Sequence, residues 1–248
     1  MTSYDPAISL SGEGPAVVLV PGMDGTGQLF YRQVPLLAQS HRVATYALRD
    51  EARDMGTLIA DLATVIDVAA PTVKRALIVG ESFGGVLGLS FALAHPDKVS
   101  GLVILNSFPY FAPRIRLRMA IAGLTVLPWG AMQLVRRLTA FRLHSRHTHR
   151  DDMAEFMRRT AQATRRGYLN RLHILRTYDV REALGGLSAP ALFVAADEDH
   201  LVPSVKQAEL MARLTPDASV RVLVGHGHIC LIAPGVDLAE VIADWRAF

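Results

Sequence analysis

The sequence has a single cysteine, few aromatic residues and no uninterrupted hydrophobic run long enough to cross a membrane. Because Cys230 has no second cysteine to pair with, no internal disulfide can form, which suits a reducing compartment. The N-terminus lacks the basic and apolar regions of a signal peptide. The most apolar stretch, residues 120–135, is interrupted by Pro128 and is shorter than the roughly 20 residues that a membrane span needs. We therefore expect a cytoplasmic protein without a transmembrane segment.

A large excess of charge of one sign is also missing, since the formal net charge is only +3. The distribution is nevertheless uneven. Residues 108–186 contain fifteen arginines and five acidic residues, a local net charge of +10, whereas the rest of the chain carries −7. Half of all residues are hydrophobic, so the chain can bury a large core, and intrinsic disorder is excluded. Residues 108–186 therefore present a different kind of surface from the remainder.

Short apolar runs with the pattern of buried strands alternate with stretches of helical periodicity. We predict strands over residues 16–20, 42–48, 76–79, 99–105, 190–195 and 219–224, and helices over residues 57–69, 86–95, 205–214 and 236–248. This alternation is typical of an α/β fold with a mostly parallel sheet flanked by helices. It breaks over residues 108–186, which are helical in pattern. The sequence predicts one α/β core, residues 1–107 and 187–248, with residues 108–186 inserted as a helical cap.

A Gly-x-Ser-x-Gly pentapeptide, Gly80-Glu81-Ser82-Phe83-Gly84, lies directly between a predicted strand and a predicted helix. A serine hydroxyl is a poor nucleophile until a base activates it and the backbone exposes it to substrate. A sharp strand-to-helix turn supplies the exposure, and small flanking residues tolerate its crowded backbone. An isolated match could be an ordinary turn, but this context favours Ser82 as a nucleophile.

Two later loops carry groups that could assist this serine. The three acidic residues 197–199 follow the strand predicted at 190–195, and Gly225-His226-Gly227-His228 follows the strand predicted at 219–224. A histidine can accept the serine proton, and a carboxylate can orient that histidine. The alternative role for the acids is to cap the next helix, a role that suits Ser204 better.

Together these motifs resemble the α/β-hydrolase superfamily over essentially the whole chain. The loop after the first buried strand, Pro21-Gly22-Met23-Asp24-Gly25-Thr26-Gly27, looks like that of lipase- and thioesterase-like members. Many relatives have His-Gly where this sequence has Pro21-Gly22, a change that keeps the backbone donor and removes a side chain. No Gly-Lys-Ser/Thr follows the loop, so it does not match a phosphate-binding loop.

The resemblance implies an acid–base pair for Ser82. Asp199 has the family's Gly-x-x-Asp-x-x-x-Pro spacing to Pro203, although alanine replaces the glycine, and Asp197 is the reserve candidate for the acid. His228 precedes a short apolar run and a proline, as the family's base does, so we favour it over His226.

Acyl transfer also needs donors for the developing oxyanion. The resemblance implies the backbone N–H of Phe83, the residue after the nucleophile, as one donor. By its position in the glycine-rich loop, the Met23 N–H is expected to be the second.

A histidine–aspartate cluster in the basic segment raises the question of a metal site. Its members are His144, His147, His149, Asp151 and Asp152. The pattern resembles the His-x-His-x-Asp-His signature of binuclear zinc hydrolases, but the spacing is off by one and the last histidine is absent. Arg146 and Arg150 would repel a cation. We expect no metal and no cofactor.

The arginines of the predicted cap bracket the apolar stretch 120–135. They are Arg114, Arg116, Arg118, Arg136 and Arg137. We favour a cap helix that covers the active site, with arginine stems packed along it. The alternative is a lid with basic edges that docks an acidic carrier protein or an anionic surface. Nucleic-acid binding is not expected, because the segment lacks interleaved aromatic residues.

The sequence therefore predicts a carboxylic-ester hydrolase, a serine esterase acting on a small-molecule ester with an apolar acyl or alcohol part. A thioesterase, or a methyl esterase for carrier-linked acyl chains, would use the same residues. A non-hydrolytic ligand receptor is the alternative from a different class, since this fold also serves such proteins.

Overall fold

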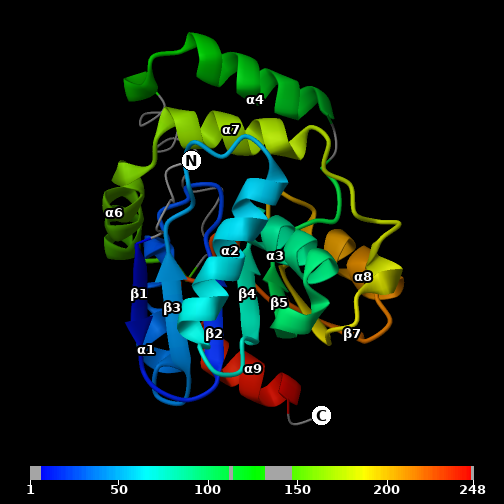
Figure 1. Ribbon diagram of the computed structural model, residues 1–248. Coiled ribbons are helices and arrows are strands. Elements are labelled where there is room, and N and C mark those ends of the chain that lie inside the picture. Colours follow the sequence, from blue (N-terminus) through cyan, green and yellow to red (C-terminus); the bar gives the residue numbers. More distant parts are fainter. Residues whose placement is uncertain (1–6, 112–113, 132–146, 247–248) are drawn as a thin grey trace.

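The computed structural model describes residues 7–111, 114–131 and 147–246. Within these residues seven strands form one sheet in the order β1-β3-β2-β4-β5-β6-β7 (Figure 1). β1 is antiparallel to β3, and every other neighbouring pair is parallel. The strands are β1 (Ile8–Ser11), β2 (Ala16–Val20), β3 (Arg42–Tyr46), β4 (Ala76–Glu81), β5 (Val99–Leu105), β6 (Ala191–Ala196) and β7 (Ala218–Leu223). The predicted mostly parallel sheet is confirmed.

The central strands are buried because helices cover both faces of the sheet (Figure 1). β4 and β6 are buried along their whole length, which explains their continuous apolar sequences. One face packs against α2 (Met55–Ala69), α3 (Phe83–Ala94) and α8 (Ser204–Leu214), and the other packs against α1 (Gln33–Leu37) and α9 (Leu238–Arg246). The parallel register aligns Glu81 with Leu105, so β4 and β5 end side by side.

Between β5 and β6, the described residues form three further α-helices: α4 (Arg114–Val126), α6 (Arg150–Arg159) and α7 (Arg165–Leu175). α4 packs on α7, and Figure 1 shows both helices above the sheet, beyond the carboxyl ends of the parallel strands. We call residues 108–186 the helical segment. None of the helices in the described ranges combines the length and apolar composition needed to cross a bilayer.

The main departure from the sequence prediction is β1, which the pattern does not predict. Its four residues are only partly buried and lie at one edge of the sheet, so their sequence carries little of the apolar signal of a central strand. The short helix α1 is not predicted either. At the predicted strands and helices the bounds move by a few residues; the helix predicted from residue 86 begins at Phe83, directly after Ser82.

Candidate active site

Ser82 occupies a strained turn between β4 and α3. Its backbone has φ 57° and ψ −118°, a left-handed conformation that costs a non-glycine residue about 1–3 kcal/mol and is found mostly at functional sites. The turn brings α3 very close to β2: a Cβ at Gly84 would lie 2.1 Å from the carbonyl oxygen of Val20. Only glycine permits this approach, which explains the last residue of the pentapeptide.

A chain of hydrogen bonds joins three residues that are far apart in the sequence. His228 Nε2 lies 3.0 Å from Ser82 Oγ, and His228 Nδ1 lies 2.7 Å from Asp199 Oδ2. The His228 and Asp199 side chains are buried, whereas Ser82 is half-buried. When Nδ1 donates its proton to Asp199, Nε2 is left to accept the proton of the Ser82 hydroxyl. The structure thus brings together the three residues predicted as nucleophile, base and acid.

The surroundings keep Asp199 ionised. Burial opposes its charge, but the positive charge of His228 and hydrogen bonds from His228, Ser204 and the Val202 amide outweigh it and lower the pKa of Asp199. The Ser204 hydroxyl donates to Asp199 Oδ2, and the Leu201 and Val202 amides donate to Oδ1 at 2.9 and 3.0 Å. The capping role expected of Ser204 is therefore wrong: Pro203 holds the N-cap position of α8, and Ser204 orients Asp199 instead.

The pKa of His228 is shifted in the opposite direction, upward. Burial disfavours the imidazolium, but the charge of Asp199 and its hydrogen bond outweigh burial and raise the pKa of His228 above its ordinary value. A histidine with a raised pKa is a stronger proton acceptor, which is what activation of a serine hydroxyl requires.

The two reserve candidates, His226 and Asp197, make contacts with residues other than Ser82 and His228. The His226 ring packs against the His147 ring, with centroids 5.2 Å apart, and burial followed by the charge of His147 lowers its pKa. Asp197 Oδ1 accepts a hydrogen bond from the Gly225 amide at 2.7 Å. Both residues therefore support the turn that precedes His228.

Asn106 is a buried residue of the site that sequence reasoning missed. It follows β5 with a φ of 46°, in the left-handed region that asparagine tolerates better than most residues. Its Nδ2 donates to the carbonyl oxygen of His228 at 2.7 Å, and its Oδ1 accepts from the Ala196 amide at 2.8 Å. Asn106 thereby ties the loop of the base to the end of the strand that leads to the acid. The available signal was a polar residue directly after a buried strand.

The two predicted oxyanion donors belong to segments that adjoin Ser82. The Phe83 amide is at the N-terminus of α3, where backbone N–H groups have no partner within the helix and the helix dipole favours negative charge. Met23 belongs to a turn closed by the Gly25 amide on the Gly22 carbonyl oxygen at 3.1 Å. A Cβ at Gly22 would lie 3.8 Å from Ser82 Cβ, so this turn lies directly against the serine.

Glu81, the residue before Ser82, is a buried carboxyl group beside these residues. Its Oε1 has no hydrogen-bond partner among the described residues. Burial, partly offset by the charge of His228, raises the pKa of Glu81 to about 8, with further increases from Asp24 and Asp199. At neutral pH the group is therefore largely protonated, which limits the negative charge around His228.

Glu81→Gln is expected to remove a pH dependence of stability. A carboxyl with a pKa of about 8 in the folded chain and 4.5 when exposed stabilises the fold fully below pH 4.5. That contribution is lost as the pH rises through 8, at up to about 1.4 kcal/mol per pH unit. Glutamine stays neutral, so the variant should resemble wild type near pH 5 and exceed it near pH 9. Denaturant unfolding from pH 5 to 9 measures this; parallel stability curves for the two proteins would contradict it.

The histidine–aspartate cluster is only partly described, because His144 lies outside the described residues. Asp152 accepts hydrogen bonds from Arg32 and from the His149 amide, and His147 packs on His226. Within the described ranges no group of three or more potential metal ligands lies together. Asp152 and His147 are thus engaged with different neighbours.

The fold and this geometry define an α/β hydrolase, and comparison with known proteins agrees. The model of the alpha/beta hydrolase fold family matches residues 15–233, and the chain belongs to this family. A protein of Yersinia enterocolitica named "Putative carbamate hydrolase RutD" is 30% identical over 223 residues, which cover 86% of this chain and 80% of that protein.

Solved structures support the same fold. An esterase from Thermogutta terrifontis has a TM-score of 0.83 at 21% identity, covering 98% of this chain and 93% of that one. The enol-lactonase from Burkholderia xenovorans has a TM-score of 0.81 at 18% identity, covering 98% of this chain and 95% of that one. The chain is therefore a hydrolase by family, and its substrate has to be argued from the site.

Proposed function

We propose that this hydrolase is a serine esterase that cleaves carboxylic esters through an acyl-enzyme on Ser82. The observation that carries the proposal is the hydrogen-bonded chain Ser82–His228–Asp199, with Ser82 held in a strained turn at the start of α3. This arrangement supplies a nucleophilic hydroxyl, a base and a group that orients the base.

In the first half-reaction, Ser82 Oγ forms a bond to the ester carbonyl carbon while His228 Nε2 accepts the hydroxyl proton. The negative charge that develops on the carbonyl oxygen is stabilised by the N–H groups of Met23 and Phe83. When the tetrahedral intermediate collapses, the carbon–oxygen bond to the alcohol breaks and His228 returns the proton to the alcohol. Asp199 holds the imidazole in the required tautomer and stabilises the imidazolium.

In the second half-reaction, water takes the place of the alcohol. His228 accepts a proton from the water as its oxygen attacks the acyl carbon, and the same two amides stabilise the second tetrahedral intermediate. Collapse breaks the bond to Ser82 Oγ, His228 protonates the serine, and the carboxylic acid leaves. A thioesterase would follow the same steps with a thiol as the leaving group.

A carbamate is the second candidate substrate. Relatives that cover most of this chain carry the name of a carbamate hydrolase, including one at 30% identity. The residues that attack an ester carbonyl can attack a carbamate carbonyl, giving a carbamoyl-enzyme on Ser82 in place of an acyl-enzyme. The two substrates differ in the resonance of the carbonyl with nitrogen, which slows attack on the carbamate.

Labelling and turnover together test these proposals. We expect a fluorophosphonate to modify wild type at Ser82 and to leave Ser82→Ala unmodified, as mass spectrometry of the intact chain would show. A matched series of p-nitrophenyl acetate, butyrate and N-alkyl carbamate then compares kcat/KM for the two substrate classes. Wild type that is neither labelled nor active on any of them would contradict the serine-hydrolase proposal and favour the receptor alternative.

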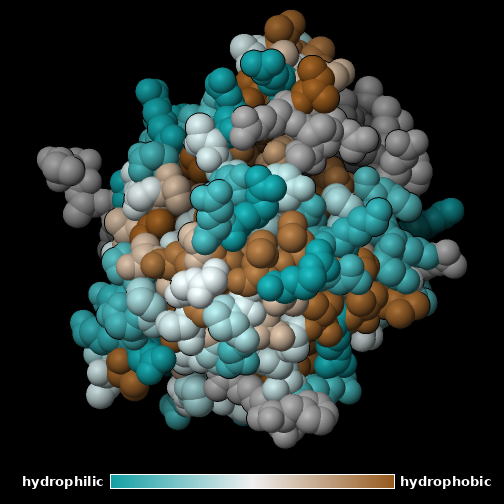
Figure 2. All heavy atoms as spheres, turned by 90° about the vertical axis from the view of Figure 1, so that its right-hand side faces the viewer, coloured by the Kyte–Doolittle hydropathy of each residue, from teal (hydrophilic) through white to brown (hydrophobic). Residues whose placement is uncertain are grey.

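We further propose that the helical segment is the cap of this site and contributes to substrate choice. α4 exposes Ile115, Met119 and Val126, and Figure 2 shows apolar side chains at the top of the molecule, where this helix lies. Arg118 is exposed on the same helix, which is compatible with an acidic carrier protein that delivers an acyl chain. Arg136 and Arg137 lie outside the described residues. The carrier, the absence of a cofactor and the cytoplasmic location remain predictions.

A further inference from the structure

Arg171 of α7 is a buried cation with no role in the reaction steps described above. The residue is 1% exposed, and burying a guanidinium is costly unless an opposite charge and hydrogen bonds replace its water. Its Nη2 donates to Asp50 Oδ1 at 2.7 Å, which supplies the opposite charge. Its Nε has no partner among the described residues, so the contacts of Nη1 and Nη2 decide where the guanidinium lies.

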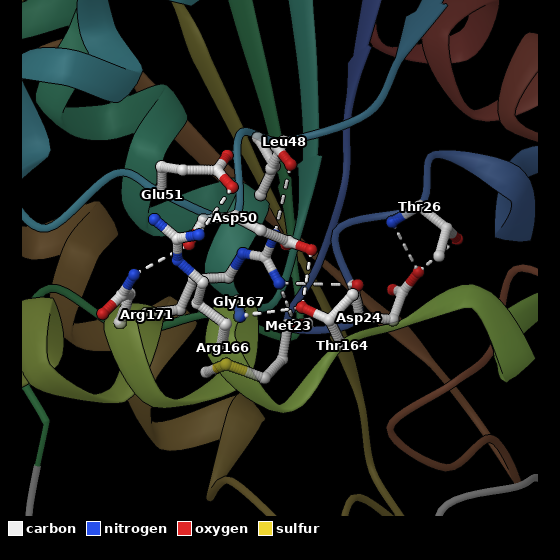
Figure 3. A network of polar contacts seen from close by, with 11 residues as sticks. Met23, Asp24, Thr26, Leu48, Asp50, Glu51, Thr164, Arg166, Gly167 and Arg171 are labelled. Carbon is white, nitrogen blue, oxygen red and sulfur yellow. Dashed lines mark hydrogen bonds and ion pairs between the residues drawn. The ribbon is translucent and has the colours of Figure 1, made fainter.

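The other contacts of Arg171 are with backbone carbonyl groups of two core loops (Figure 3). Nη1 donates to the Met23 oxygen at 3.1 Å and makes a longer contact with the Asp24 oxygen at 3.5 Å. Nη2 donates to the Leu48 oxygen at 3.3 Å. One side chain of the helical segment therefore joins the loop that follows β2 to the loop that follows β3.

The turn that contains Met23 is shaped around this guanidinium. Gly25 has a φ of +73°, and a Cβ on it would lie 2.1 Å from Arg171 Nη2, so only glycine leaves room for the cation. Met23 and Asp24 are the two central residues of the turn that Gly25 closes on Gly22. The Met23 N–H belongs to the Gly22–Met23 peptide, whose oxygen accepts from the Gly25 amide. That amide belongs to the Asp24–Gly25 peptide, whose oxygen contacts Arg171.

We infer that Arg171 is a positioning residue that holds the Met23 amide in the orientation required to stabilise the oxyanion. The inference rests on the proposed function, in which Met23 N–H is one of the two donors. Such donors accelerate a reaction because they are already oriented when the charge develops. Arg171 acts on the Met23 N–H indirectly. It restrains the carbonyl groups of the two central residues, and with them the Gly25 amide, whose hydrogen bond to the Gly22 oxygen fixes the peptide that carries the Met23 N–H.

α7 has two further attachments to the core, through the side chains of Thr164, at its N-cap, and Asn170. The Thr164 hydroxyl donates to Asp50 Oδ2 at 2.6 Å, and Asn170 Nδ2 donates to the Asp50 carbonyl oxygen at 2.7 Å. Removal of the guanidinium therefore leaves the helix docked while releasing the turn.

The test compares Arg171→Met with Arg166→Met in the full chain. Arg166 is a matched control, because it lies on the same helix and pairs with the neighbouring Glu51 at 3.1 Å, but both side chains are more than half exposed. We expect Arg171→Met to lower kcat on a p-nitrophenyl ester by about 10- to 100-fold with KM changed less than about threefold, and Arg166→Met to match wild type. Hydrogen exchange at residues 22–26 should quicken in Arg171→Met alone.

Two further measurements separate positioning from general damage to the fold. Arg171→Lys keeps a positive charge beside Asp50 but cannot reach both loops, so its kcat should lie between those of wild type and Arg171→Met. Millimolar guanidinium chloride should raise kcat of Arg171→Ala and leave that of Arg166→Ala unchanged, an effect that a merely destabilised fold would not show.

Different results would contradict the positioning role of Arg171 and the serine-esterase proposal. An active wild type with an Arg171→Met variant of unchanged kcat, or one whose loss lies wholly in KM, overturns the positioning role and leaves the esterase proposal intact. A wild type that a fluorophosphonate does not label overturns the serine-hydrolase proposal, and the role of Arg171 falls with it.

Discussion

His228→Ala is expected to lower kcat for ester hydrolysis by about 10⁴- to 10⁶-fold, because no other group would accept the Ser82 proton. The distance of 3.0 Å from His228 Nε2 to Ser82 Oγ is that of a hydrogen bond, and the raised pKa of His228 strengthens it as a base. Steady-state turnover of a p-nitrophenyl ester measures the loss. Fluorophosphonate labelling of Ser82 should slow in parallel, since it needs the same base.

His226→Ala is the matched control, two residues away on the same loop. Its ring packs on His147, and kcat should stay within about twofold of wild type. A variant pair in which His226→Ala is inactive and His228→Ala is active would reverse the assignment of the base.

Asp199→Asn is expected to lower kcat by about 10³- to 10⁴-fold, because an amide no longer holds the imidazole in the tautomer that accepts the serine proton. The substitution also removes the charge and the hydrogen bond that raise the pKa of His228. The rising limb of kcat/KM against pH, which reports the loss of a proton from His228, should therefore move to lower pH.

Asp197→Asn provides the comparison for Asp199→Asn. Asp197 bonds the Gly225 amide, a contact that asparagine can keep through its side-chain oxygen, so the pH profile should stay in place. A pH profile that shifts in Asp197→Asn and not in Asp199→Asn would show that Asp197, and not Asp199, is the acid.

Much of the sheet follows from local sequence because its central strands are buried on both faces. β2 and β5 have the bounds that their apolar runs predict, since parallel strands covered by helices read as continuous hydrophobic segments. β1 is the counter-example. Its pairing with β3 depends on a partner more than thirty residues away, and its exposed positions leave no pattern to detect.

Within the candidate site, Ser82 and its partners His228 and Asp199 could be predicted, and the residues that position them could not. The turn around Ser82 is formed by residues that are neighbours in the chain. The close approach of α3 to β2 requires glycine at position 84, and this glycine is visible in the sequence motif. Asn106 and Arg171 act across more than eighty residues of chain, on His228 and Met23 respectively. Neither belongs to a motif, because the loops that they join meet only when the sheet is assembled.

The sequence by itself determined the α/β class, the turn that presents Ser82 and the short lists from which an acid and a base had to come. Those features depend on residues that are neighbours in the chain. The tertiary structure decided which histidine reaches the serine and which carboxylate reaches that histidine. It also decided that Glu81 is buried beside them and that Arg171 of the helical segment binds the Met23 turn. Each of these depends on where strand ends and loops meet in space, which spacing along the chain does not encode.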